Sequence, residues 1–419
     1  MSHATAIPQT ATSEDEREHR LPVGSTFPND DVLADARRIV ILRLDNAGDV
    51  MLAGPTIRAL RAAHPDAHLT LVASPVGAEA AELLPWLDDV VPWRALWQDA
   101  SGSLAFDPDR EQAAIERLRC LRADAALILT SFSQTPFAAG YACYLAGIPI
   151  RIGHQESFGG GVLSHPVPGP APIHQAERNL HLIRSVGVTI DDSTLAARVP
   201  DGSRALSARL IRSAGDDTAA PIVVAPGASC SARRYDPTYF AQAAAELRAR
   251  TERLVVVIGT AKERRLAAPI IEAVPDALDL VGRTSLVEAA AVIEAAGVVL
   301  ANDSLAMHLA DAFERPVVVA FAGTDAEAEW GPRKTRYVLL REPTPCAPCR
   351  LFDCPVDGHP CVAIDPRRVV DAAMLLLGGE RRASVRTPMS GVAPSMDSVR
   401  DRAMASASWR TDRIEVMSR

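Results

Sequence analysis

The chain has 419 residues, enough for two or three domains that each bury a core. Hydrophobic residues make up 48% of it and charged residues 23%, which excludes a coiled coil, a collagen-like fibre and a chain disordered throughout. The net charge of -8 comes without a basic stripe, so nucleic acid is not an expected partner. No apolar run is long enough for a membrane helix and no hydrophobic signal segment opens the chain, so we expect a cytoplasmic protein.

The two ends of the chain differ from its body. Residues 1–36 and 380–419 mix Pro, Ser, Thr and charges without periodicity. Neither end has enough apolar surface to offset the entropy lost on ordering, so we predict two disordered tails. Between them, short apolar runs alternate with amphipathic stretches of helical length, a pattern typical of parallel α/β units.

In the first half of the body, the apolar runs predict strands and the stretches between them predict helices. Strands are expected at 39–44, 69–73, 125–129 and 150–152, and helices at 55–64, 76–84, 110–122, 136–146 and 175–186. We therefore place a first domain at 37–190. Turn sequences such as PDGS and GDDT then predict a linker with a small helix at 191–220.

The same pattern restarts in the second half. Strands are expected at 222–225, 254–258, 298–301 and 317–320. We place a second domain at 221–379, with a cysteine-rich loop at 346–361. The sequence therefore predicts an α/β protein with two Rossmann-like, doubly wound domains in tandem.

The first candidate site follows the first strand, in the segment RIVILRLDNAGDVMLAGPTIRAL. This strand leads into a polar loop with Gly48 and Asp49, and ligands of open α/β sheets bind at the carboxyl ends of strands. Asp49 is expected to project into a cleft above the sheet, or alternatively to cap the following helix, which we expect near Pro55. Neither GxGxxG nor GxxxxGK[ST] occurs here, which argues against a dinucleotide oxidoreductase and a P-loop NTPase.

Two segments of the second half predict an anion site. In VVAPGASCSARRYDPTYFAQAA, a loop of small residues precedes Arg233 and Arg234. Small residues let backbone amides approach an anion, and arginine adds a bidentate grip on phosphate. The alternative is a pair of solvated surface arginines.

The second such segment is VVLANDSLAMHLADAFERPVVVAFAG, whose buried strand ends at Asn302 and Asp303. A helix is expected to follow, and its unpaired first-turn amides form an anion site at Ser304, Leu305 and Ala306. His308 lies one turn along the same face and is expected near the same anion. Alternatively, Asp303 is only a helix cap and His308 a packed histidine.

Two further motifs carry candidate chemistry. Glu263, at a helix start in IGTAKERRLA, is expected to accept ribose hydroxyls or to interact with the helix dipole. The segment CAPCRLFDCPVDGHPC has a CxxC spacing but gaps that are short for a zinc ribbon. We predict a cysteine-rich loop without metal, with zinc as the alternative, held by Cys346, Cys349, Cys354 and Cys361.

Taken together, these motifs resemble glycosyltransferase family 9, the ADP-heptose:lipopolysaccharide heptosyltransferases. The matching segments are RLDNAGDVMLAGPTIRAL, RIGHQE, HQAERNLHLIRSVG, APGASCSARRYDP, ANDSLAMHLADAFERPVVVAFAGTD and the CAPC…CP…C stretch before IDPRRVV. The resemblance implies a GT-B fold, in which two Rossmann-like domains face a central cleft. It also implies that the first domain holds the acceptor and the second the nucleotide sugar.

The resemblance further implies roles for individual residues. The family's catalytic aspartate falls on Asp49, with Asp45 as the alternative base. Its phosphate-binding lysine falls on Arg233, beside Arg234, and its ribose-contacting glutamate falls near Glu263. The donor-contacting aspartate and the phosphate-binding amides fall on Asp303, Ser304, Leu305 and Ala306.

The function implied is an inverting, metal-independent transfer of heptose from ADP-heptose to a lipopolysaccharide inner-core acceptor of the Kdo-lipid A type. Such an enzyme needs no cofactor, and its acceptor lies at the inner membrane, where peripheral contact is expected. One alternative is a family 9 enzyme with another nucleotide sugar or an acceptor such as a natural product or surface glycan. A non-catalytic nucleotide-sugar-binding protein and a GT-B epimerase are the others.

Overall fold

The structure is a computed structural model that describes residues 31–99, 102–132, 134–215 and 219–378. Disordered tails were predicted at 1–36 and 380–419, and of these, residues 1–30 and 380–419 lie outside the described residues. Residues 31–36, which we had assigned to the first tail, instead form a turn against the first domain. Leu33 is fully buried there and the Val32 amide donates to the Val186 carbonyl at 2.9 Å, so apolar burial and backbone pairing order this segment.

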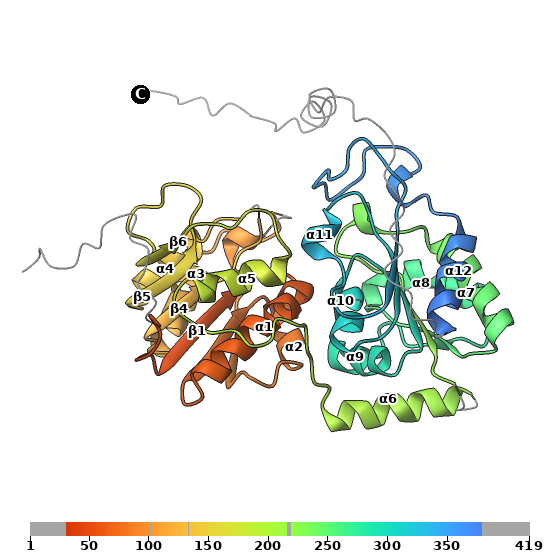
Figure 1. Cartoon of the computed structure of the whole chain (residues 1–419), viewed down its shortest axis with the longest axis horizontal. Coiled ribbons are helices and arrows are strands. Elements are labelled where there is room, and N and C mark those ends of the chain that lie inside the picture. Colours follow the sequence, from red (N-terminus) through yellow and green to blue (C-terminus); the bar gives the residue numbers. More distant parts are fainter. Residues whose placement is uncertain (1–30, 100–101, 133, 216–218, 379–419) are drawn as a thin grey trace, which may run out of the picture.

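Two α/β domains lie side by side, each with a parallel sheet covered by helices (Figure 1). The strand orders are β3-β2-β1-β4-β5-β6 in the first sheet and β12-β11-β10-β7-β8-β9 in the second. Counted along each domain, both correspond to the Rossmann order 3-2-1-4-5-6. The predicted GT-B architecture of two Rossmann-like domains is therefore confirmed.

The strands of the first domain are β1 (Arg38–Arg43), β2 (His68–Ala73), β3 (Asp89–Pro92), β4 (Ala125–Ile128), β5 (Ile150–His154) and β6 (His165–Val167). Its helices are α1 (Ala47–Ala63), α2 (Pro75–Ala81), the short η2 (Leu96–Gln98), α3 (Pro108–Cys120), α4 (Phe137–Leu145) and α5 (Gln175–Arg184). The four predicted strands are present. The prediction missed the outer strands β3 and β6, which are short and partly exposed and so lack a continuous apolar run.

Helix α6 (Asp201–Ala214) lies in the segment predicted as a linker with a small helix. The second sheet contains β7 (Ile222–Ala225), β8 (Val255–Val257), β9 (Leu278–Asp279), β10 (Val298–Asn302), β11 (Val317–Ala320) and β12 (Tyr337–Leu340). The helices that follow α6 are η3 (Ser231–Arg233), α7 (Pro237–Thr251), η4 (Ala261–Glu263), α8 (Arg264–Ala273), α9 (Leu286–Glu294), α10 (Leu305–Ala312), α11 (Glu327–Trp330), η5 (Pro360–Val362) and α12 (Pro366–Leu377).

Helix α1 begins earlier than predicted. We expected its start near Pro55, but it begins at Ala47 and includes Pro55. The reason is a capping box, in which Asn46 and Asp49 satisfy each other's backbone amides. The buried run that follows, from Val50 to Ala53, stabilises the additional turns and offsets the hydrogen bond that proline removes.

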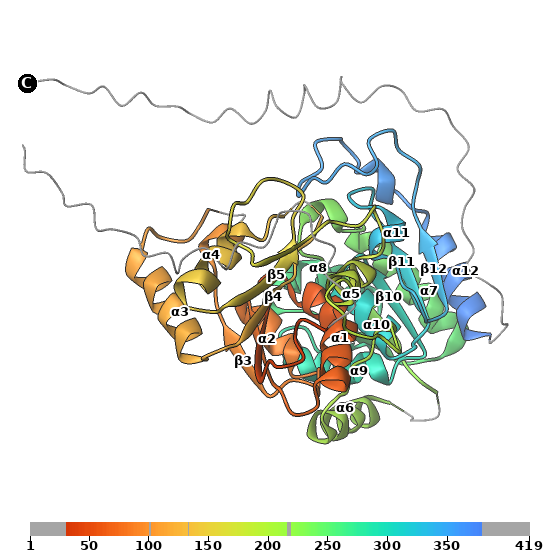
Figure 2. The same cartoon turned by 60° about the vertical axis from the view of Figure 1, so that its left-hand side comes forward.

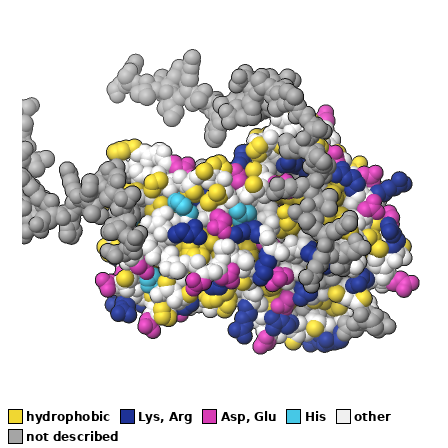
Figure 3. Space-filling view, in the orientation of Figure 1, with side chains coloured by type: hydrophobic (Ala, Val, Ile, Leu, Met, Phe, Trp, Pro, Cys, Tyr) yellow, Lys and Arg dark blue, Asp and Glu magenta, His cyan; other side chains and the backbone are white. Residues whose placement is uncertain are grey.

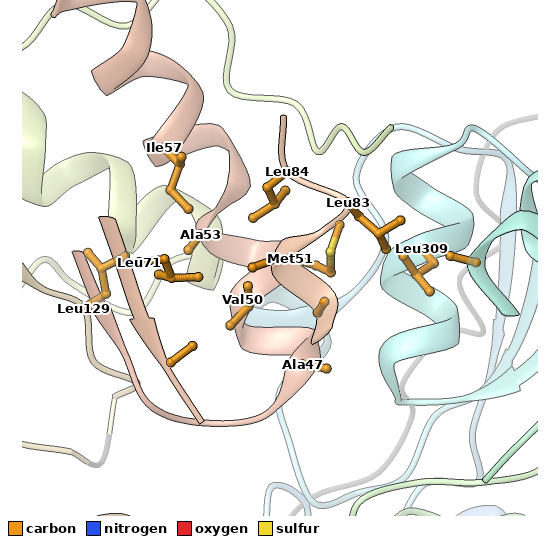
Figure 4. Packing of buried hydrophobic residues seen from close by; sticks show 14 of the residues in the cluster. Ala47, Val50, Met51, Ala53, Ile57, Leu71, Leu83, Leu84, Leu129 and Leu309 are labelled. Carbon is orange, nitrogen blue, oxygen red and sulfur yellow. The ribbon is translucent and has the colours of Figure 1, made fainter. Parts of the chain in front are cut away.

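The two domains share an apolar interface. Helix α1 packs against α10, and both views place these helices next to each other (Figures 1 and 2). Met51 and Leu83 from the first domain face Leu309 of α10, as Figure 4 shows, and all three are buried. This packing brings the carboxyl ends of the two sheets to a common cleft.

Polar contacts reinforce the interface at one side. Arg333 forms an ion pair with Glu177 of α5 and donates to the Ser193 carbonyl at 2.8 Å. The His174 Nε2 atom lies 3.0 Å from the Gly331 carbonyl oxygen. Burial and the charge of Arg333 lower the pKa of His174 to about 3, so this histidine is neutral at pH 7.

The surface of the molecule carries charges of both signs. On the face that Figure 3 shows, basic and acidic side chains are interspersed over both lobes. No helix among the described residues combines the length and the apolar composition that crossing a bilayer requires.

Candidate functional site

A cavity of about 560 Å³ lies between the two domains. It is lined by the first turn of α1, by part of α2, and by the segments that follow β7, β8 and β10. β1 and β7 are next to the topological switch point of their sheets, where successive strands begin to be added on the other side. Open α/β sheets bind ligands at the carboxyl ends of the strands at this point. Most of the predicted site residues line this cavity, namely Gly48, Asp49, Arg233, Glu263, Asp303, Ser304, Leu305, Ala306 and His308.

Arg234 is the predicted site residue that lies outside the cavity lining. Its Nη2 atom donates to the Ala228 carbonyl at 3.0 Å and its Nε atom to the same oxygen at 3.3 Å. Arg234 therefore braces the loop after β7.

Asp49 reaches the cavity from the first turn of α1 rather than from a loop. Its Oδ1 atom accepts from Arg43 Nη2 at 2.6 Å and its Oδ2 atom accepts from the Asn46 amide at 3.1 Å. The sequence allowed Asp49 either to project into a cleft or to cap a helix. In the structure it does both, because it caps α1 and also lines the cavity. Each carboxylate oxygen has a second lone pair, so Asp49 can still accept a proton from a bound hydroxyl.

Arg43, which the sequence analysis missed, is the buried partner of Asp49. Its Nη2 atom also lies 3.0 Å from Asp45 Oδ2 and donates to Ser131 Oγ at 2.8 Å. Burial raises the pKa of Asp45, with Arg43 acting in the opposite direction. Asp45 lies outside the cavity lining and accepts from Gln134 at 2.8 Å, so its position favours a structural role over that of a base.

Arg233 enters the cavity from η3. It donates to Asp325 Oδ2 at 2.6 Å and to Ser229 Oγ at 3.4 Å, and its Nε atom lies 3.8 Å from Asp303 Oδ2. Two carboxylates therefore hold the guanidinium of Arg233 beside the start of α10.

The loop before Arg233 is fixed by Asn302, the last residue of β10. Asn302 Nδ2 donates to the Pro226 carbonyl at 2.9 Å, and its Oδ1 atom accepts from the Tyr235 amide at 2.9 Å. These bonds tie the two anion-site motifs together. The dipeptide Asn302-Asp303 at a strand end was the available signal, but it does not reveal which loop the asparagine holds.

Asp303 is a buried carboxyl group at the centre of this arrangement. Burial raises its pKa to about 7, the charge of Arg233 opposes the shift, and Asp325 and Asp49 add to it. Among the described residues, no group donates a hydrogen bond to Asp303 Oδ2. The helix cap is Ser304, and the amides of Leu305 and Ala306 follow at the start of α10. A positively polarised helix start next to arginine is suited to a diphosphate.

His308 links the anion site to the first domain. It is buried against Gly48, where an added Cβ atom would lie 3.1 Å from the His308 ring. Burial lowers the pKa of His308 to about 4, while Asp49 opposes the shift, so the ring is neutral at pH 7. The absence of a side chain at Gly48 is what allows α1 and α10 to approach this closely.

Glu263 lies at the opposite side of the cavity. Its Oε2 atom accepts from the Thr260 amide at 2.7 Å and from the Thr260 hydroxyl at 2.9 Å, which makes it part of a capping box at η4. Its Oε1 atom lies over Gly227, where an added Cβ would be only 1.8 Å away. The carboxylate is therefore a cap that also offers an oxygen to the cavity.

Part of the cavity lining contributed by the second domain is apolar. Ile258, on the strand side of Glu263, and the α9 residues Leu286, Ala289 and Ile293 contribute apolar side chains to the lining of the cavity. An apolar wall beside an acidic group and an anion site can hold a flat nucleobase, with a ribose between them.

The described residues form no cluster of three or more His, Cys, Asp or Glu side chains that could hold a metal ion. Cys346, Cys349, Cys354 and Cys361 are free thiols, and burial raises the pKa of Cys349 and Cys361. The CxxC spacing in the sequence allowed a zinc site, but within the described residues these cysteines are not brought together as a set of metal ligands.

Comparison with known proteins gives a consistent result. The model of glycosyltransferase family 9 (heptosyltransferase) matches residues 113–359, more than half of the chain. Among curated proteins, no significant match to the sequence is found.

Several solved structures share the fold. A glycosyl transferase family 9 protein from Veillonella parvula superimposes with a TM-score of 0.68 at 20% identity, covering 85% of this chain and 100% of that one. ADP-heptose LPS heptosyltransferase II of E. coli gives 0.63 at 22% identity, covering 81% of this chain and 98% of that one. E. coli heptosyltransferase WaaC with ADP gives 0.61 at 16% identity, with coverages of 81% and 99%.

Proposed function

Because the chain belongs to glycosyltransferase family 9, we propose that it is an inverting enzyme that moves heptose from ADP-heptose to a lipopolysaccharide inner-core acceptor. The observation that carries the proposal is the cavity itself. Asp49 enters it from the first domain, and Arg233, Asp303 and the start of α10 enter it from the second. A base and an anion site therefore face the same space.

The second domain is the proposed donor site. The diphosphate would lie at the amides of Leu305 and Ala306, with Arg233 beside it. The ribose would approach Glu263, and the adenine would contact the apolar wall. Two of the structures with the same fold are an ADP-heptose heptosyltransferase and a heptosyltransferase with ADP, which supports adenosine diphosphate as the carrier.

The proposed reaction needs a proton acceptor. Asp49 accepts the proton of the acceptor hydroxyl as its oxygen attacks the anomeric carbon, on the face opposite the leaving group. The bond between that carbon and the diphosphate oxygen breaks at the same time, so the configuration inverts. Arg43, at the end of β1, orients the Asp49 carboxylate through its ion pair with Oδ1.

The leaving group of the reaction is ADP, whose terminal phosphate gains negative charge in the transition state. Arg233 and the start of α10 supply positive charge at that position, which is the task that a metal performs in other transferases. We therefore propose that the chemistry proceeds without a bound metal.

The acceptor is proposed to bind on the first domain, next to Asp49. A Kdo-lipid A type of acceptor lies at the inner membrane, so we also propose a peripheral contact at its cytoplasmic face.

The test combines binding and transfer. Calorimetry would measure the binding of ADP, with UDP and GDP as controls. Incubation with ADP-heptose and Kdo₂-lipid A would then be analysed for the glycosylated lipid and for ADP. We expect selective binding of ADP and formation of both products. Preference for another nucleotide would overturn the donor, transfer to a different acceptor only would overturn the lipopolysaccharide substrate, and binding without any turnover would favour a non-catalytic protein.

A further inference from the structure

The cysteine-rich loop 346–361 packs against η3, the short helix that carries Arg233. The Ala232 amide donates to the Phe352 carbonyl at 3.0 Å, and His359 Nε2 lies 2.9 Å from the Ala232 carbonyl oxygen. The loop thus pairs with both the backbone amide and the backbone carbonyl of Ala232, the residue before Arg233.

Arg350 extends this contact to the side chain of Arg233. Its Nη1 atom donates to Asp325 Oδ1 at 2.9 Å, and its Nη2 atom donates to Glu329 Oε2 at 2.6 Å. The other oxygen of Asp325, Oδ2, accepts from Arg233 Nη2 at 2.6 Å. A single buried carboxylate is therefore shared between the cavity arginine and an arginine of the cysteine-rich loop.

The backbone also fixes Arg350 in this position. Its amide donates to the Thr324 carbonyl at 2.9 Å, and the Cys349 amide donates to the Gly323 carbonyl at 2.9 Å. The loop therefore approaches Asp325 through its main chain as well as its side chain. Asp325 and Glu329 have side chains only 6% and 9% exposed, so water competes little for these bonds.

Sharing the carboxylate has a geometric consequence. While Arg350 engages Oδ1, Asp325 offers Arg233 only Oδ2, and the rest of the Arg233 fork can face a phosphate. Without Arg350, the Thr324 hydroxyl still donates to Oδ2 at 2.9 Å, but Oδ1 loses its partner. The carboxylate can then bind Arg233 through both oxygens, the arrangement that an arginine and a carboxylate favour. The fork would then be withdrawn from the cavity.

We propose that Arg350 is a positioning residue, which holds Asp325 so that Arg233 presents its guanidinium to the diphosphate of the donor. This inference rests on the proposed function, since it assumes that Arg233 binds the diphosphate.

The test compares Arg350→Gln with Arg368→Gln, a matched control. Arg368 is similarly exposed and pairs with Glu342 before the loop, so its loss removes the same charge without touching Asp325. Calorimetry with ADP should show about tenfold weaker binding for Arg350→Gln and a change below about twofold for Arg368→Gln. In the transfer assay, the donor KM should rise while the acceptor KM stays constant. Equal effects of the two variants would overturn the proposal.

A double-mutant cycle separates positioning from an independent effect. In an Arg233→Gln background, Arg350→Gln should not weaken ADP binding further, because it acts through Arg233. Additive losses would overturn the inference. If Arg350→Gln does not fold, Glu329→Gln serves instead, since it releases the second anchor of Arg350. It should also weaken ADP binding, and this effect should also vanish in the Arg233→Gln background.

The outcomes also separate this inference from the proposed function. If the wild-type protein binds no ADP, the proposed donor fails, and the inference fails with it. If the wild type binds ADP and Arg233→Gln weakens binding, but Arg350→Gln does not, only the positioning role is wrong.

Discussion

Replacing Asp49 by asparagine tests the proposed base with little change of shape. Asp49 accepts from Arg43 and from the Asn46 amide through separate oxygens, and asparagine has only one oxygen, so we expect that oxygen to keep a weaker bond to Arg43 while the Asn46 amide loses its acceptor. It cannot take up the proton of an acceptor hydroxyl. We expect kcat to fall by about 100-fold to 10,000-fold, the range typical for loss of a general base.

The cost to folding can be estimated from the partners of Arg43. This fully buried guanidinium would keep Asp45 at 3.0 Å and Ser131 at 2.8 Å, and its charged bond to Asp49 at 2.6 Å would become a weaker bond to a neutral amide oxygen. Hydrogen bonds to charged groups contribute about 1.5 to 3 kcal/mol. Urea unfolding should therefore show a destabilised but folded variant, and its affinity for ADP should be unchanged.

Asp45→Asn is the matched control. It also weakens a carboxylate bond to Arg43, but Asp45 lies outside the cavity lining. Its cost in stability should be similar, while initial rates of transfer from ADP-heptose should stay within about tenfold of wild type. The assignment of Asp49 would be refuted if both variants lost the same activity, or if Asp49→Asn retained turnover within that tenfold range.

Three more predictions follow from the cavity. Ionisation of Asp303, whose pKa is raised to about 7, should weaken ADP binding about tenfold between about pH 6 and pH 8, and Asp303→Asn should remove that dependence in calorimetry. Gly227→Ala would place a Cβ 1.8 Å from Glu263 Oε1, so the donor KM should rise about tenfold or more, whereas Gly161→Ala, which meets nothing within 4 Å, should not change it. The pKa of His308 is lowered from 6.5 to about 4, so between these values the unfolded chain binds a proton that the folded protein does not. The free energy of unfolding is therefore unaffected by His308 above about pH 6.5 and decreases as the pH falls below it. At about pH 5 the loss is about 2 kcal/mol relative to about pH 7.5, and urea unfolding of His308→Gln should show a correspondingly smaller decrease.

The inner strands of both sheets could be predicted from the sequence because parallel strands buried on both faces read as uninterrupted apolar runs. β7 and β11, for example, are buried along their whole length. β9 has only two residues, both half-buried, and so carries no such signal. The start of α1 was placed too late because Pro55 was read as an initiator, although the cap at Asn46 was also present in the sequence.

The residues of the candidate site that could be predicted from the sequence are those that follow the ends of strands. Motifs after β7 and β10 converge because these strands are neighbours in the sheet. The partners of those residues were not predictable in the same way. Arg233 and Asp325 are 92 positions apart in the sequence. Asp325 is the last residue of the segment ANDSLAMHLADAFERPVVVAFAGTD, but nothing in that segment indicates that it pairs with Arg233.

The proposed base and the proposed leaving-group site belong to different domains, so the distance between them depends on how the domains pack. The contact between Gly48 and His308 lies where the two domains meet. Gly48 directly precedes Asp49, and His308 lies in the first turns of α10. A neutral, buried histidine can pack against glycine without carrying a charge into the interface. A larger side chain at position 48 would push α1 away from α10 and carry Asp49 with it. The small residue before Asp49 is therefore best explained as a spacing element, which sets how closely the proposed base faces the proposed anion site.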